Sequence, residues 1–200
     1  MKKTRYKKGA WLLLTFVITV LLIASCGYNQ KPEDSKDVAE EHNDAKFEDN
    51  DQEKDAQFLV NAAEIHLEEI QLGKLAQQIG RTTQVKELGK MMEDVHTKSL
   101  NDLTALAARK MVTIPTSPTD DAKDAYEKLS DKSRNDFDKS YADMMVSEHK
   151  DAISIYEKAS SECDDTDIKN WASASLPGLR KHLDHSIDCQ MNYKDNNNHM

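Results

Sequence analysis

Five residues that can bind a transition metal interrupt apolar stretches of this sequence: Glu69, His96, Glu148, His149 and His182. Imidazole and carboxylate are typical ligands of first-row transition metals, and a cation neutralises acids that are otherwise costly to bury. One shared metal requires the ring nitrogens to converge, because each bond is about 2 Å long. Two alternatives stay open, namely solvated residues at the edge of a helical surface and a hydrogen-bonded layer that holds no ion.

Helices are the elements that have to position these residues, because Gly and Pro are scarce and no stretch alternates with the two-residue period of a strand. Apolar residues at three- and four-residue steps predict four long helices over residues 55–79, 83–111, 133–162 and 167–193. Gly80 ends the first helix, and Pro115 and Pro118 separate the second from a short extra helix over residues 120–131. This order predicts an all-α, up-down four-helix bundle with one long crossover that carries the short extra helix.

The positions of the candidate ligands along the helices predict that they lie at one height. Glu69 and His96 lie on either side of the turn near position 81, at similar distances from it along the chain. His149 and His182 flank the turn near position 164 in the same way. If the two helical hairpins align, these residues form one polar layer in the middle of the bundle.

Methionines close to the histidines suggest a second choice of metal. Two adjacent methionines precede both His96 and His149 at the same spacing, namely Met91-Met92 and Met144-Met145. Soft sulfur together with imidazole suits copper, although methionine is more often a gap filler in a helical core. The sequence therefore leaves the choice of metal open. Iron or another transition metal is the first option, and copper is the minor option.

Residues 1–25 have the layout of a bacterial export signal. Five cations and no acid surround the start of an apolar run from Ala10 to Ala24, which is shorter than the roughly 20 residues that span a bilayer. Residues 23–26, Ile-Ala-Ser-Cys, resemble the lipobox, which implies removal of residues 1–25 and lipidation of Cys26. We therefore expect a lipid-anchored protein of the cell envelope, outside the cytoplasm, whose membrane partner is reached through Cys26. An ordinary secretory signal that contains a cysteine is the alternative.

Charge and composition define the rest of the chain. The 27 basic residues less the five of the signal leave 22 against 36 acids, so the mature chain has a net charge near −14 and nucleic acid is not an expected partner. Residues 26–54 are predicted to be an acidic disordered tether, residues 55–193 the bundle, and residues 194–200 a disordered tail. Cys163 at the end of the third long helix and Cys189 near the far end of the fourth fall on the order of 30 Å apart and are predicted to be free thiols.

Several stretches of the chain resemble one family of proteins. They are Asp55 to Phe58 with Ala62-Ala63, Glu69 to Ala76, Met92 to Lys98, Phe137 to Tyr141 through Met145 to His149, and Leu176-Pro177 with His182-Leu183. Together they resemble the ferritin-like bacterial envelope proteins catalogued as domain of unknown function 4142. The resemblance implies a ferritin-like helical bundle, often exported, with no established activity. One departure is Val95, where the family usually has an acid directly before the histidine, and Asp94 is displaced by one position.

The spacing of acids and histidines does not predict a complete di-iron site. Such a site needs a Glu on each of two helices and Glu-x-x-His on each of the other two. Three of the long helices fit this pattern, but Leu179 stands three residues before His182 on the fourth. No nucleophile or phosphate-binding motif indicates another enzyme. Two functions stay open: metal binding or sequestration at the envelope, and a non-catalytic interaction or stress-related module without metal, whose protein partner is unknown.

Overall fold

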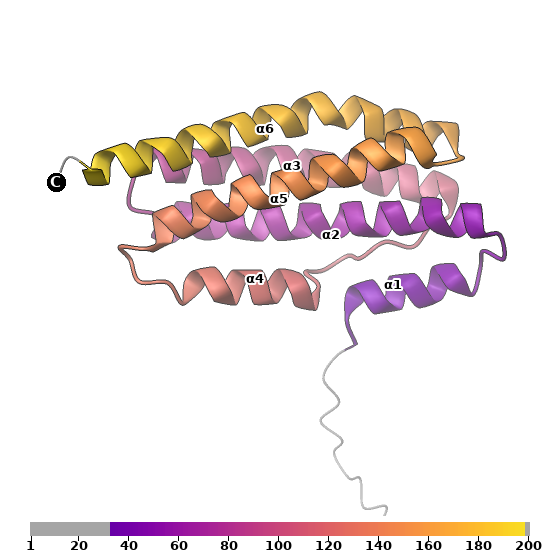
Figure 1. The fold of residues 1–200 in the computed structure, drawn as a ribbon. Coiled ribbons are helices and arrows are strands. Elements are labelled where there is room, and N and C mark those ends of the chain that lie inside the picture. The colour runs from indigo at the N-terminus through magenta and orange to yellow at the C-terminus, as the bar shows by residue number, and fades with distance from the viewer. Residues whose placement is uncertain (1–32, 199–200) are drawn as a thin grey trace, which may run out of the picture. The chain divides into compact units, whose positions relative to one another are not determined.

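The structure is a computed structural model that describes residues 33–198, with side chains up to residue 192. Six α-helices account for most of this part of the chain (Figure 1). They are α1 (Ser35–Asp44), α2 (Asn50–Ile79), α3 (Thr83–Lys110), α4 (Asp120–Ser130), α5 (Phe137–Glu162) and α6 (Thr166–Asn198). No strand occurs within residues 33–198, so the all-α prediction is confirmed. The four long helices and the short extra helix start and end within about five residues of their predicted positions.

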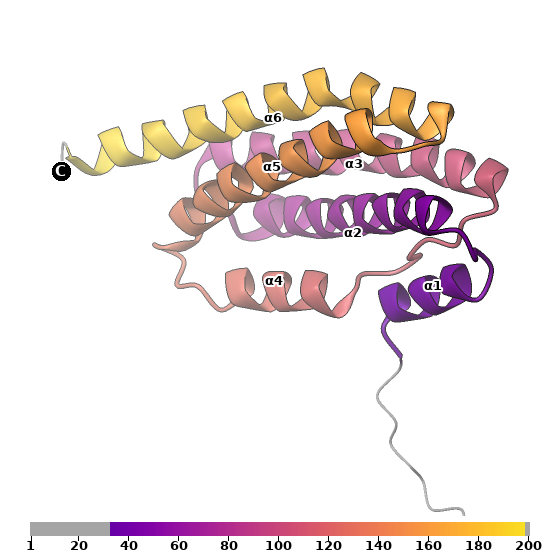
Figure 2. The same cartoon turned by 45° about the vertical axis from the view of Figure 1, so that its right-hand side comes forward.

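The long helices form two hairpins. α2 packs along α3 and α5 packs along α6, and residues 80–82 and 163–165 join the members of each pair. Figures 1 and 2 show the four long helices side by side, with α4 and α1 next to α2. The link from α3 to α5 carries α4, as predicted, and α4 packs against α2. α2 is therefore covered by neighbours on more sides than an ordinary surface helix.

The acidic segment differs from the predicted disordered tether over residues 26–54. Within its described part, residues 35–44 form α1 and residues 50–54 form the first turn of α2. The predicted tail over residues 194–200 likewise differs, because the backbone of α6 continues to Asn198. High charge predicted disorder because composition alone does not show which of these residues contact the rest of the domain.

Specific contacts hold α1 in place. The Asp34 carboxylate accepts a hydrogen bond from the Lys36 backbone N–H and so caps the helix. The buried Asn43 side chain donates to the Thr113 carbonyl oxygen at 2.8 Å and accepts from the Thr113 N–H at 2.8 Å. The Lys36 ammonium lies 2.6 Å from a Glu64 carboxylate oxygen on α2. These partners lie far away in sequence, which is why the acidic composition did not reveal them.

The predicted export signal and Cys26 lie outside the described residues. Among helices α1 to α6, none is long and apolar enough to cross a membrane. Cys163 and Cys189 are both buried and free, which confirms the prediction of two thiols.

Two apolar clusters fill the two ends of the long helices, and polar residues separate them. On α2 the first cluster ends at Ala63 and the second begins at Leu72, so that His66 and Glu69 lie between them. The same gap occurs on the other long helices, where it contains His96 on α3, His149 on α5 and His182 on α6. The predicted polar layer therefore exists, with packed apolar side chains on both sides.

Two buried aspartates link the hairpins at opposite ends. The Asp138 carboxylate on α5 accepts hydrogen bonds from the Arg81 and Thr82 N–H groups, at 2.8 and 2.9 Å, in the turn between α2 and α3. The Asp55 carboxylate on α2 accepts from the Asp164 and Asp165 N–H groups, at 3.1 and 2.7 Å, in the turn between α5 and α6. Because each hairpin holds the turn of the other, their relative height is fixed.

α2 and α3 come very close together at two glycines. A Cβ atom added to Gly73 would lie 2.6 Å from the Gly89 carbonyl oxygen, and one added to Gly89 would lie 2.7 Å from the Gly73 carbonyl oxygen. Backbone atoms cannot rotate out of the way, so a larger residue at either position must push the helices apart. The glycines therefore set the separation of α2 and α3 beside the polar layer.

We expect Gly89→Ala to lower the free energy of unfolding by about 1–3 kcal/mol, the usual cost of overpacking a well-packed contact. Gly178→Ala is the matched control, because a Cβ atom at this exposed position on α6 would have no atom within 4 Å. The control should be up to about 1 kcal/mol more stable than the parent, since Ala favours helix over Gly. Urea unfolding measures both effects, and equal stability of the two variants would contradict the close approach.

Candidate metal centre

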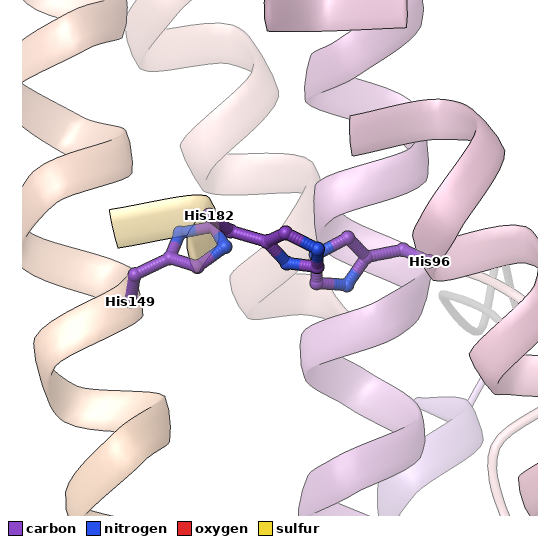
Figure 3. A group of neighbouring side chains, drawn as sticks. All are labelled: His96, His149 and His182. Carbon is purple, nitrogen blue, oxygen red and sulfur yellow. The ribbon is translucent and has the colours of Figure 1, made fainter. Parts of the chain in front are cut away.

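Three of the predicted histidines meet in the middle of the long helices. Each of His96, His149 and His182 offers a ring nitrogen, and these atoms all lie within 4.8 Å of one another. The ring centroids are separated by 5.6 Å for His96 and His149, 5.4 Å for His96 and His182, and 5.5 Å for His149 and His182. Figure 3 shows the rings approaching one another from α3, α5 and α6. This arrangement could hold a metal ion.

One nitrogen of each of these rings has no hydrogen-bond partner. The three atoms are His96 Nε2, His149 Nε2 and His182 Nδ1, all of them buried. A buried polar atom without a partner costs free energy, and packed helices rarely tolerate several of them together. A neutral imidazole nitrogen that accepts no hydrogen bond has its lone pair free, which is the form that binds a metal.

The second nitrogen of His149 is held by neighbouring groups. His149 Nδ1 lies 2.9 Å from the Met145 carbonyl oxygen, which can only accept, so the ring proton is on Nδ1. Glu69 Oε1 is 3.3 Å from the same nitrogen. A carbonyl or carboxylate behind an imidazole fixes its orientation and tautomer, and it raises the basicity of the opposite nitrogen. His149 Nε2 therefore carries no proton, and its lone pair can bind a metal.

His66 and Tyr156 support His96 in the same way, although the sequence did not indicate them. His66 Nδ1 lies 3.0 Å from His96 Nδ1, and the Tyr156 hydroxyl lies 3.2 Å from His66 Nε2. If His96 uses Nε2 as a ligand, its Nδ1–H donates to His66 Nδ1. The remaining proton of His66 is then on Nε2 and is donated to the Tyr156 hydroxyl oxygen.

The two predicted carboxylates lie outside the group of three nitrogens. Glu69 contacts the far side of the His149 ring, and its Oε2 atom has no hydrogen-bond partner. Glu148 interacts with the carboxyl of Glu68 on α2, and burial together with the nearby Glu69 and Glu68 raises the pKa of Glu148 to about 11. Glu68 therefore lies beside the polar layer as well.

Burial shifts the titration of every group in this layer. It lowers the pKa of His66 to about 3, those of His149 and His182 to about 4, and that of His96 well below 6.5. Burial also raises the pKa of Glu148 to about 11 and the pKa values of Glu68 and Glu69 above their usual range. The dry surroundings thus disfavour charge on both imidazoles and carboxyls.

The other candidates from the sequence have ordinary structural surroundings. Met92 and Met145 are fully buried in the apolar cluster around Leu72, where they act as core side chains. Asp94 lies 2.7 Å from Lys90 on the same exposed face of α3, so it does not take the place of the acid that Val95 lacks.

One family of proteins matches most of the chain, including the candidate centre. The family model described as "Domain of unknown function (DUF4142)" matches residues 39–188. The chain belongs to this family. No curated protein and no solved structure matches the chain. All the residues of the candidate centre lie inside the DUF4142 match.

We expect the metal-free protein to lose stability as the pH rises above about 6.5. Protonated Glu148 contributes stability that is full below its unfolded pKa of 4.5 and is lost as the pH rises toward the folded value of about 11. The imidazoles act in the opposite direction, because their contribution is full above 6.5 and is lost as the pH falls toward about 4. Above pH 6.5 the effect of the imidazoles no longer changes with pH, so the carboxyl effect determines how the free energy of unfolding varies.

Urea unfolding of chelator-treated protein between pH 6.5 and 9 measures this decline. Glu148→Gln keeps the shape of the side chain and cannot ionise, so its stability should fall less steeply than that of the parent. Glu162→Gln, the same change at an exposed position on the same helix, is the control and should leave the slope unchanged. An equally steep decline in Glu148→Gln would show that the buried carboxyl does not cause it.

Proposed function

We propose that this protein binds one first-row transition-metal ion through His96, His149 and His182, within a ferritin-like four-helix bundle. The observation that carries the proposal is the convergence of three histidines, each of which offers a ring nitrogen within 4.8 Å of those of the other two and has one buried nitrogen without a hydrogen-bond partner. Three imidazoles around an ion in a tetrahedral arrangement at about 2.0–2.1 Å lie ~3.3 Å apart. The nitrogens, which lie within 4.8 Å of one another, would have to approach by up to about 1.5 Å to reach that separation.

The ligand set favours a transition metal over magnesium or calcium. Imidazole suits zinc, copper, iron and nickel, whereas magnesium and calcium need oxygen ligands. The methionine side chains lie in the apolar cluster, which leaves copper without a thioether ligand and favours a site built of imidazoles. Iron, zinc and copper therefore remain the ions to test, with copper as the minor option.

The surrounding acids supply the charge that a cation needs. Glu69 is 2 % exposed and lies behind His149, so it can ionise when the ion brings positive charge into the layer. Glu69 is a positioning residue and not a ligand. Glu148 and Glu68 are two further carboxyl groups close to Glu69. The nitrogens without hydrogen-bond partners and the raised pKa values of the carboxyls are two consequences of burying this layer.

The location of the protein is part of the proposal and is supported by the sequence alone. The export signal expected over residues 1–25 and the lipobox resemblance at Cys26 favour a lipid-anchored protein of the cell envelope. Metal binding or sequestration outside the cytoplasm is then the role, rather than catalysis. The competing proposal is a non-catalytic interaction module, in which the buried layer only fixes the register of the helices.

We expect the tag-free protein to retain about one metal ion per chain after loading with iron, copper, zinc or manganese and removal of excess metal. His96→Ala and His182→Ala each remove one of three ligands, which should weaken binding by at least tenfold, the usual minimum for loss of a metal ligand or its support. His185→Ala is the matched control, because His185 is an exposed histidine three residues further along α6. Elemental analysis by mass spectrometry measures the ratio of metal to protein.

No stoichiometric metal with any of the four elements would reject the metal proposal and favour the interaction module. Retention of metal in His96→Ala and His182→Ala at the level of His185→Ala would mean that the ion binds elsewhere on the acidic surface. Circular dichroism of each variant excludes misfolding as the cause of lost metal.

A further inference from the structure

A cleft of about 370 Å³ connects the three-histidine centre with solvent. It lies between α3 and α6, and its inner wall includes His96 and His182, while His149 does not line it. His66 and Tyr156 also reach the inner wall, next to Trp171. The cleft therefore reaches the centre at His96 and His182, and neither His149 nor Glu69 lines it.

This placement matters for the number of ligands that a bound ion can have. Three imidazoles leave at least one position of a tetrahedral transition metal for another donor. Centres that only stabilise a fold are closed by four protein ligands, whereas centres that bind a further molecule keep one position open. Here the protein supplies three convergent nitrogens, and the cleft ends at two of them.

The walls of the cleft limit the size and chemistry of that donor. Val95, Trp171 and Leu179 give the inner part an apolar surface. Polar residues line the rest of the cleft, where Lys98 and Asp102 are exposed and lie 3.6 Å apart. The cleft is large enough for a small molecule to reach His96 and His182.

We propose that the cleft admits a small monodentate donor, such as azide, hydroxide or free imidazole, to an open coordination position on the ion held by His96, His149 and His182. The inference rests on the proposed metal binding and adds that the centre is an open one. The donor enters between α3 and α6, passes Gly178 and reaches the ion beside His96 and His182.

Gly178 gives direct experimental access to the cleft. It lines the cleft on α6, and a Cβ atom there would have no other atom within 4 Å, so a large side chain can be added without a clash at its base. Gly178→Phe should fill the cleft while leaving all three histidines in place. Ala174→Phe, one turn earlier on the same wall, is a second blocking variant. Ser173→Phe is the control, because Ser173 is exposed on α6 and does not line the cleft.

The test uses the full-length, tag-free chain loaded with Co²⁺, whose visible absorption reports its ligands. Addition of azide should change the spectrum with a saturable dependence in the parent and in Ser173→Phe. Azide affinity should be at least tenfold weaker in Gly178→Phe and in Ala174→Phe, although both bind Co²⁺ as tightly as the parent. That pattern supports an open position reached through the cleft.

Two other results overturn the inference in distinguishable ways. If Co²⁺ binds through the histidines but azide leaves the spectrum unchanged, the coordination position is closed. If azide acts equally on the blocking variants, the position is reached by another route. In both cases the proposed metal binding stands. If the parent takes up no Co²⁺, the proposed function fails and the inference fails with it. Circular dichroism and urea unfolding of each Phe variant separate blocking from misfolding.

Discussion

Burial of polar groups between two apolar clusters is the constraint on which the rest of this structure depends. Imidazole nitrogens and carboxyl oxygens lie between the clusters, and several of them have no hydrogen-bond partner. Such groups are costly unless they bond to each other or to an ion. His66 and Tyr156 satisfy one side of His96, and Met145 and Glu69 one side of His149, while three nitrogens stay without partners. A cation at their centre would resolve that cost.

Long-range backbone contacts bring the layer together. Asp55 and Asp138 each hold the turn of the opposite hairpin, so α2 with α3 cannot slide along α5 with α6 without breaking charge-assisted hydrogen bonds. The close contact at Gly73 and Gly89 brings α2 and α3 near enough for His66 to reach His96. Metal affinity should therefore depend on residues far from the ion, because they set the height and spacing of its ligands.

Helix periodicity was sufficient to predict the four long helices, and counting residues from the turns predicted the common height of His96, His149 and His182. His66 could not be found in this way, because it lies beside the apolar series that Glu69 interrupts, and the sequence does not show that α2 is covered on that side as well. Side-chain direction was also beyond the sequence, so Glu148 was expected near the ion although it turns toward Glu68. The charged helix α1 escaped prediction because its partners are remote in sequence.

X-ray absorption spectroscopy at the edge of the bound metal tests the central claim most directly, because it counts ligands without relying on substitutions. Three imidazole nitrogens at about 2.0–2.1 Å, with at most one or two further oxygen or nitrogen donors, is the result that the account predicts. An ion surrounded by oxygen alone, by fewer than three imidazoles or by methionine sulfur would contradict it.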